Sequence, residues 1–288
     1  MKSEYNWKRA LGVAAVWLAV FVSWEAAYRI IGWKPYVFPA PSHVVDAVMN
    51  LIGIKSYFGD ALAGGVDGPW PFHGRGLVVE GAIWKCQLLT ALGVSLLRLL
   101  VGFALSIVLG LAVGLAMFRF KFVDALLGPV FLGLQTLPSV CWVPLAVLAI
   151  GINESGILFV TVMGSFFAFA ITLRDGLRTT PPIYRSAGLV FGAHGLRFYT
   201  QIMLPAGLPA LAGALRSGFS FAWRSLMGGE LIFVLKAHGV GHLLATGREY
   251  GDVAQVVASM LLMVLIGMAA DRLIFARVER RVRARFGL

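Results

Sequence analysis

The sequence predicts an all-α membrane protein that crosses the bilayer six times. Of its 288 residues, 59% are hydrophobic and 14% are charged, and the mean hydropathy is +0.81. A soluble domain is about 45–50% apolar and about 25% charged. The apolar residues also fall into long runs, and most Lys and Arg residues lie between alternate runs. These observations exclude a globular cytosolic enzyme and a disordered chain.

Six apolar segments are long enough to span the membrane, since a helix needs about 20 residues to cross the hydrocarbon. They cover residues 10–31, 89–118, 127–150, 156–173, 205–235 and 254–275. The first is too long for a signal peptide. The second and fifth exceed the minimum length, so we expect them to tilt or to extend beyond the bilayer.

The distribution of basic residues predicts the orientation of these segments. If the N-terminus lies inside, the inner connections and termini hold fourteen Lys and Arg residues and the outer ones hold six. Cytoplasmic loops collect such residues, so both termini are expected inside. The same rule accounts for the net charge of +11 without a nucleic-acid partner.

Two connections are long and suggest a division of the chain. Residues 1–88 would form one span and an extended outside segment, and residues 89–288 a five-helix core. Within the core, the inner connection 174–204 carries four arginines. A connection of this length usually has a purpose beyond linkage.

Small residues recur every fourth position in two segments and predict close helix packing in lipid. In the second segment they are Gly102, Ser106, Gly110 and Gly114, and in the fifth Ala206, Ala210, Ala214, Gly218 and Ala222. The third segment contains Pro138 and Pro144, each of which disfavours a straight helix. They indicate either a passive kink or a break that lines a cavity.

Charged residues inside the spans are expected to face protein or water. Arg98, Arg216 and Asp271 lie near segment ends, where extending to the membrane surface is an alternative to facing protein. Arg224 lies near the middle of the fifth segment and forms one stripe with Arg216 and Ser220. Arg224 either lines an anion path or makes an ion pair or carbonyl contact between helices. The candidate translocation residues are Arg216, Ser220, Trp223, Arg224 and Glu230.

The sequence lacks the common motifs for nucleotide binding, catalysis and metal binding. It contains no Gly-Lys dipeptide, which a phosphate-binding P-loop requires, and neither HExxH nor GxSxG. His238 and His242 lack a third candidate metal ligand nearby, and Cys86 and Cys141 match no redox or zinc spacing. We therefore predict no catalysis, metal or cofactor in this chain.

The inner connection carries a spaced motif. Ser186-Ala187-Gly188 is followed after three residues by Gly192 and after nine more by Ile202-Met203-Leu204-Pro205. This resembles the motif of bacterial binding-protein-dependent ABC transporter permeases, with Ser186 replacing the usual Glu and Gly188 replacing the second Ala. Leu137-Pro138, Ser95 to Arg98, and Ala222-Trp223-Arg224 with Glu230 resemble the nitrate, sulfonate, taurine and bicarbonate branch.

The resemblance implies a type I ABC importer permease in a bacterial inner membrane. A short coupling helix over about 181–197 would lie in a groove of an ATPase subunit, and Gly192 would permit the turn after it. The residues implied at this contact are Ser186, Ala187, Gly188, Gly192, Ala193, Ile202, Leu204 and Pro205.

The implied partners are ATPase subunits that bind ATP and magnesium, a second permease copy, an external substrate-binding protein and membrane lipid. The substrate would be a small anion, namely nitrate, bicarbonate, a sulfonate or taurine. A heterocyclic or other non-anionic nutrient stays open, and so does a stand-alone secondary transporter, although no inverted repeat is visible. An intramembrane enzyme is disfavoured because the catalytic motifs are missing.

Overall fold

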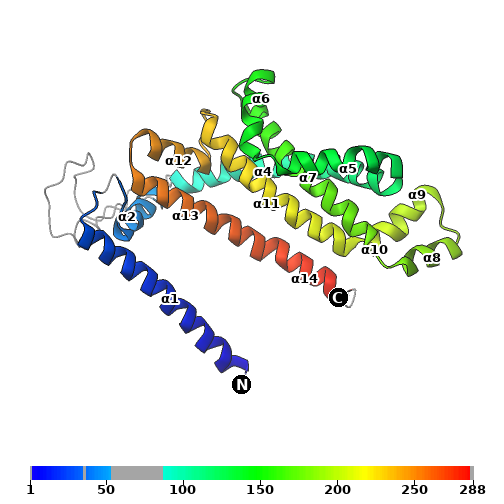
Figure 1. Cartoon of the computed structure of the whole chain (residues 1–288), viewed down its shortest axis with the longest axis horizontal. Helices are drawn as coiled ribbons and strands as arrows, with labels where there is room; N and C mark the ends of the chain where they lie inside the picture. The colour runs from blue at the N-terminus through cyan, green and yellow to red at the C-terminus, as the bar shows by residue number, and fades with distance from the viewer. Residues whose placement is uncertain (1, 35–36, 53–86, 286–288) are drawn as a thin grey trace. The chain divides into compact units, whose positions relative to one another are not determined.

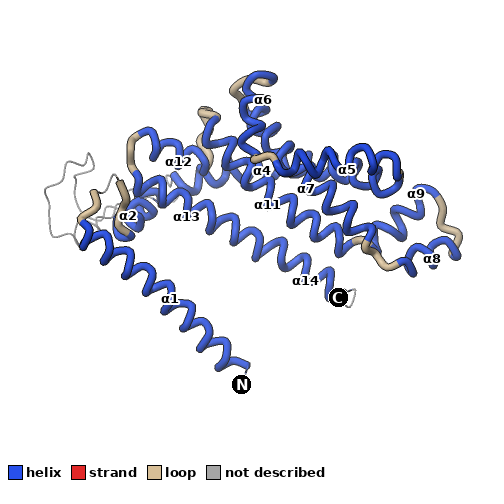
Figure 2. The backbone as a smooth tube through the Cα atoms, viewed as in Figure 1, coloured by secondary structure: helices blue, strands red, loops and turns tan. Residues whose placement is uncertain are grey.

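The computed structural model describes residues 2–34, 37–52 and 87–285, and within these ranges every regular element is a helix (Figures 1 and 2). The predicted outside segment around 53–85 and Cys86 lie beyond these ranges. The chain forms two compact units, one of residues 1–92 with 243–262 and one of residues 93–242 with 263–288. The predicted division at residue 88 stays a prediction.

The first unit begins with α1 (Lys2–Ile31) and α2 (Pro41–Ile52). The ring of Trp24 packs against Phe38 with centroids 5.5 Å apart. The Glu25 carboxylate accepts hydrogen bonds of 3.4 Å from both the backbone N–H and the hydroxyl of Ser42, at the start of α2. These contacts join the two helices across the proline-rich turn.

The second unit is built on α4 (Gln87–Arg119), α7 (Glu154–Arg178) and α11 (Leu208–Ile232). Helix α7 begins at Asn153, whose side chain accepts a 3.0 Å hydrogen bond from the Gly156 N–H and so caps the helix. Most of α7 is buried, and it runs beside α11 (Figure 1). It is the central helix of this unit.

The small residues of α4 pack against α7, as the sequence predicts. A Cβ atom added at Gly110 would lie 2.6 Å from Cδ1 of Phe169, and one at Gly114 would lie 3.0 Å from the carbonyl oxygen of Ala170. Between these glycines and Gly102, the hydroxyl of Ser106 lies 2.6 Å from that of Ser165. The missing side chains therefore allow the two helices to approach closely.

The small residues of α11 likewise face α7. A Cβ added at Gly176 of α7 would lie 2.5 Å from the Cβ of Ala210, and Ala214 and Ala222 are fully buried. Gly218 approaches the rings of Phe103 and Phe169. Both predicted small-residue ladders are confirmed as packing surfaces, except that Ala206 lies before the start of α11.

The third predicted span is a broken helix rather than one straight segment. It consists of α5 (Lys121–Thr136), a 3₁₀ turn (Ser139–Cys141) and α6 (Trp142–Ala149), with a bend of 99° between the two parts. Leu137 has an extended backbone, with ψ of 129°, because a following proline disfavours the helical region. The prediction of one span over 127–150 is corrected accordingly, and α5 begins six residues earlier.

The remaining elements complete the chain. After α7 come α8 (Pro182–Val190), α9 (Gly195–Phe198), the π-helix η3 (Tyr199–Met203) and α10 (Leu204–Ala206). After α11 come α12 (Val240–Glu249), α13 (Val253–Ala270), the π-helix η4 (Asp271–Phe275) and α14 (Ala276–Arg285).

Three helices of the described ranges are long and apolar enough to cross a membrane, or four if the bent pair counts as one span. They are Leu88–Arg119, Glu154–Arg178 and Val253–Arg285. Helix α11 is not among them, and Arg216, Arg224 and Glu230 lower its hydropathy. The protein is thus a multi-pass membrane protein, and the count of six spans stays a prediction.

We expect Gly176→Ala to lower the melting temperature of the purified protein by several degrees. The added methyl collides with Ala210, and overpacking of this kind costs about 1–3 kcal/mol. The matched control is Gly213→Ala, because a Cβ at Gly213 meets nothing within 4 Å. Alanine also has the higher helix propensity, so the control should leave stability unchanged or raise it. Equal melting temperatures for the two variants would contradict the packing argument.

Candidate functional site

The segment that joins α7 to α11 contains the predicted coupling residues. Helix α8 begins at Pro182 and ends in a Schellman motif. There the Ala193 N–H donates to the carbonyl of Gly188 and the Gly192 N–H donates to that of Leu189, both at 3.0 Å. Gly192 has φ of +74°, so the positive φ predicted for it is confirmed. The motif glycine is therefore the residue that ends the helix.

The positions of Gly188 and Ile202 in the motif also have a structural reason. A Cβ on Gly188 would lie 2.5 Å from Cδ1 of Ile202 and 3.3 Å from the ring of Phe198. Helix α8 can rest on the following π-helix only because residue 188 has no side chain. Ser186 and Ala187 are exposed, Ala193 is half-buried and Pro205 is exposed. The side chain of Leu204 lies outside the described part of the chain.

Helix α8 presents large apolar side chains to its surroundings. Ile183, Val190 and Phe191 are largely exposed, Phe191 to 86%. A cluster of exposed apolar residues on a connecting segment typically marks an interaction surface. The segment thus combines a fixed backbone with an apolar outer face, which suits docking against another protein.

An ion-pair cluster fixes the end of α7 from which this segment leaves. Asp124 of α5 pairs with Arg174 at 2.9 Å and with Arg178 at 2.7 Å. A Cβ on Gly128 would lie 2.7 Å from Nη1 of Arg174, so the glycine makes room for the guanidinium. The start of the connecting segment is therefore held against α5.

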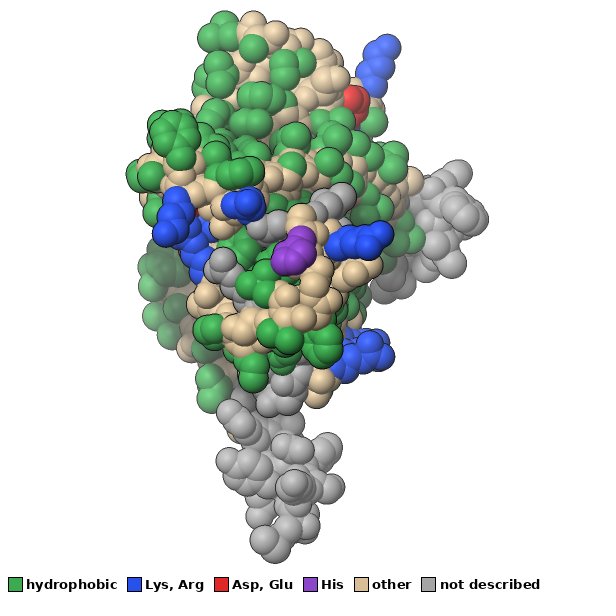
Figure 3. Space-filling view, turned by 90° about the vertical axis from the view of Figure 1, so that its right-hand side faces the viewer, with side chains coloured by type: hydrophobic (Ala, Val, Ile, Leu, Met, Phe, Trp, Pro, Cys, Tyr) green, Lys and Arg blue, Asp and Glu red, His purple; other side chains and the backbone are tan. Residues whose placement is uncertain are grey.

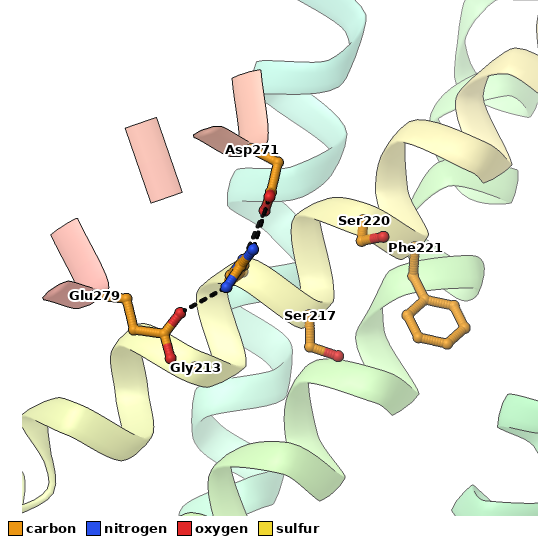
Figure 4. A pocket seen from close by; sticks show the side chains of 7 residues that line it. Gly213, Ser217, Ser220, Phe221, Asp271 and Glu279 are labelled. Atoms are coloured by element: carbon orange, nitrogen blue, oxygen red, sulfur yellow. Dashed lines mark hydrogen bonds and ion pairs between the residues drawn. The ribbon is translucent and has the colours of Figure 1, made fainter. Parts of the chain in front are cut away.

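A groove of about 430 Å³ lies along one face of α11. Its lining residues are Gly213, Arg216, Ser217, Ser220, Phe221, Asp271 and Glu279. Arg216 donates two hydrogen bonds of 2.7 Å to the two carboxylate oxygens of Asp271 and one of 3.0 Å to Glu279; dashed lines mark these pairs (Figure 4). Of the two alternatives for Arg216 and Asp271, the structure shows the one in which they face protein, because they bind each other.

Arg224, two turns further along α11, has a different environment. Its Nε donates to the backbone carbonyl of Ser220 at 3.1 Å, and its guanidinium lies 4.5 Å from the ring centroid of Phe221. Arg224 and Ser220 are exposed, and among the described residues no carboxylate pairs with Arg224. The inter-helix ion pair that the sequence left open for Arg224 is not formed in this part of the chain.

The two other candidate translocation residues face the packed interior. Trp223 is buried, and its indole N–H donates to the carbonyl of Met263 at 3.3 Å. Glu230 is also buried, at the far end of α11. The structure thus leaves Ser220 and Arg224 exposed and Arg216 half-buried on α11, whereas Trp223 and Glu230 are buried against neighbouring helices.

Glu230 belongs to a buried polar cluster with α4. Its carboxylate, whose side chain is 1% exposed, pairs with Arg98 at 2.9 Å and accepts hydrogen bonds of 2.7 and 2.9 Å from the Ser95 hydroxyl. Arg98 also pairs with Glu154 at 2.6 Å, and Glu154 is 53% exposed. Of the two alternatives for Arg98, the structure shows the one in which it faces protein, because two carboxylates hold it inside.

The backbone of the next connection closes over this cluster. The Gly241 N–H donates to Glu230 at 3.0 Å, and Arg98 donates to the carbonyl of Ala237 at 2.8 Å. A Cβ at Gly239 would collide with the Glu230 carboxylate, so this connection needs glycine there. Glu154 was not predicted as a partner of Arg98, although the predicted topology puts Arg98, Glu154 and Glu230 at the same side of the membrane.

We expect Glu230→Gln to destabilise the protein strongly. Removing one partner of a buried ion pair costs about 3–5 kcal/mol, and in this variant Arg98 keeps only the half-exposed Glu154 as an acidic partner. Glu154→Gln is the control, since its half-exposed side chain should contribute little. Thermal unfolding of the single variants and of Arg98→Gln/Glu230→Gln forms a double-mutant cycle. Additive losses in the double variant would show that the two residues do not interact.

Comparisons with known proteins agree with this architecture. The family model described as binding-protein-dependent transport system inner membrane component matches residues 106–284. A putative ABC transporter permease of Methanocaldococcus jannaschii is 27% identical over 193 residues, which cover 67% of this chain and 72% of the relative.

Two relatives carry substrate names. The nitrate import permease protein NrtB of Synechocystis is 26% identical over 180 residues, 62% of this chain and 65% of the relative. The bicarbonate transport system permease protein CmpB of Synechococcus elongatus is 23% identical over 205 residues, 71% of each chain.

A solved structure shows the same fold. The MetNI methionine ABC transporter in an inward-facing conformation matches with a TM-score of 0.57 and 18% identity, covering 68% of this chain and 95% of that chain. The family model spans more than half of the sequence, from the middle of α4 to the last described helix. This chain belongs to the inner membrane components of binding-protein-dependent transport systems, the ABC transporter permeases.

Proposed function

We propose that this permease imports a small anion and receives the energy for transport from ATPase subunits that bind the segment α8–α10. The observation that carries the anion part is Arg224, an exposed cation on α11 with no carboxylate partner among the described residues. The names of two relatives, a nitrate and a bicarbonate permease, support the same substrate class. Sulfonates and taurine are further candidates.

The apolar face of α8 supports an ATPase contact. Burying side chains such as Ile183, Val190 and Phe191 would contribute about 1.5–3 kcal/mol each. The Schellman motif and the contact between Gly188 and Ile202 hold this face in one orientation. A rigid, apolar projection can transmit a movement of the partner to α11, whereas a mobile loop would absorb it. ATP and magnesium would be bound in those partner subunits.

The face of α11 that carries Ser220 and Arg224 supports a second permease copy. A lone arginine at the bilayer centre costs about 2.5–3.5 kcal/mol on insertion scales, so it must face water or protein. Two copies, or a copy and a sibling, placed with these faces together would enclose a path lined by Arg216, Ser220 and Arg224. An external binding protein would deliver the anion, with both termini of the permease in the cytoplasm.

Arg216 and Arg224 would then act differently along this path. The charge of Arg216 is offset by Asp271 and Glu279, whereas Arg224 keeps its charge available. A fixed cation offsets part of the cost of dehydrating an anion, and conduction requires that the binding stays weak. A non-anionic nutrient is the second candidate, and it would not need the charge at residue 224.

Ala187→Asp should abolish the ATPase activity that the loaded binding protein stimulates. Ala187 is exposed on α8, so the change adds a buried charge only when a partner covers the helix. Gly192→Pro should have the same effect, because proline cannot adopt φ of +74°. Ala284→Asp, at an exposed site of α14, is the matched control and should remain coupled. Normal stimulation in both test variants, inserted at normal levels, would remove α8 from the ATPase contact.

Arg224→Gln should lower anion uptake by about tenfold at saturating binding protein, as expected for the loss of a charged hydrogen bond of about 1.5 kcal/mol. Arg224→Lys should retain part of the activity because it keeps the charge. In contrast, Arg216→Gln should lower the melting temperature, since Asp271 and Glu279 lose their partner. If Arg224→Gln instead reduces assembly while uptake per assembled complex is unchanged, the residue is structural and the substrate is not selected by its charge.

A further inference from the structure

A groove of about 850 Å³ lies where α4 meets α5, beside the segment α8–α10. Residues at the junction of α4 and α5 and residues of the connecting segment line the same groove. The lining residues from α4, α5 and the chain between them are Phe118, Arg119, Phe120, Lys121 and Phe122. Opposite them lie Leu177, Arg178, Leu189, His194, Phe198 and Met203, among others. None of the residues that line this groove is acidic.

Two of the groove's cations are available for a ligand. Arg178 is paired with Asp124, but in the described part of the chain neither Arg119 nor Lys121 forms an ion pair. The guanidinium of Arg119 lies 5.2 Å from the ring centroid of Phe120. The groove therefore carries uncompensated positive charge.

Aromatic residues alternate with these cations along the chain. Phe118, Phe120 and Phe122 interleave with Arg119 and Lys121, and the side chain of Phe122 is 78% exposed. Figure 3 shows the end of the molecule with α5, α8 and α9, where Lys and Arg side chains border a largely hydrophobic surface. A site for a small soluble anion needs no such apolar walls, whereas an amphiphile does.

The place of the groove in the fold limits the choice of amphiphile. Arg119 is the last residue of a helix able to span the membrane, and Lys121 is the first residue of the bent helix pair that passes the same test only as a whole. Basic pockets between transmembrane helices on the cytoplasmic side bind lipid headgroups, and the phenylalanines of this groove offer an apolar surface to acyl chains.

We propose that this groove binds an anionic phospholipid of the surrounding bilayer. Its phosphate would lie between Arg119 and Lys121. The parts of its acyl chains nearest the headgroup would contact Phe120 and Phe122. Leu189 and Phe198 form the opposite wall, so the lipid would join the corner between α4 and α5 to the coupling segment. This site is independent of the charge of the transported substrate.

Native mass spectrometry of the full-length chain in neutral detergent tests the proposal, with phosphatidylglycerol and phosphatidylcholine as probes. We expect retention of phosphatidylglycerol over phosphatidylcholine. Arg119→Gln/Lys121→Gln should weaken phosphatidylglycerol binding by about 30-fold, the loss that two basic residues at about 1 kcal/mol each imply. The exchange Arg119→Lys/Lys121→Arg should retain the binding. The control Lys236→Gln/Arg248→Gln removes two exposed cations elsewhere and should have no effect.

Two further arms separate the lipid from other occupants. Phe120→Ser/Phe122→Ser should weaken phosphatidylglycerol binding while leaving the charge intact, and inorganic phosphate should not displace the lipid. Displacement by phosphate alone would show a soluble-anion site and overturn the proposal. Unchanged lipid binding in Arg119→Gln/Lys121→Gln, or an equal loss in the control, would also overturn it. So would loss of ATPase association in this variant with lipid binding intact, which would make the groove a protein contact.

Discussion

The close approach of α4 and α11 to α7 is the constraint on which the other features depend. Phe169 of α7 is fully buried, and it contacts Gly110 from one side and Gly218 from the other. Lipid chains are as apolar as these helices, so the hydrophobic effect contributes little to their association, and fit between surfaces has to supply it. The small residues give that fit. They also fix the rotation of α11, which leaves Ser220 and Arg224 exposed.

Acidic partners neutralise the charges of four arginines in these three helices. At one end, Arg98 lies between Glu230 and Glu154, and at the other end Asp124 holds Arg174 and Arg178. Arg216 binds Asp271 and Glu279. Each of these arginines has an acidic partner that reduces its cost in a low-dielectric environment. Arg224 has no acidic partner among the described residues, and this difference is the observation behind the proposed anion path.

The sequence predicts the helical class, the two packing ladders and a kink or break in the third segment, since each of these depends on residue type and local spacing. The turn at Gly192 is predicted from the family resemblance. The sequence does not predict that Arg98 and Glu230 meet, because 132 positions separate them and only the packing of α4 against α11 brings them together. For a similar reason, the sequence does not predict that some of the candidate translocation residues are exposed and others buried. Helical periodicity groups the stripe Arg216, Ser220 and Arg224, but Trp223 and Glu230 were included by resemblance. The structure turns both of these residues inward.

The π-helix at Asp271–Phe275 has a consequence for the evolution of the C-terminal region. A π-turn adds one residue to a helix, and one residue corresponds to about 100° of rotation around the axis. Within residues 263–285, the extra residue brings Asp271, Phe275 and Glu279 to face α11, where Phe275 stacks on Phe219 with centroids 4.4 Å apart. Deletion of a single residue here would preserve the helix and its hydropathy, yet it would turn Glu279 and the arginines beyond it to another side. Insertions and deletions in this helix are therefore constrained by its angular register rather than by its length.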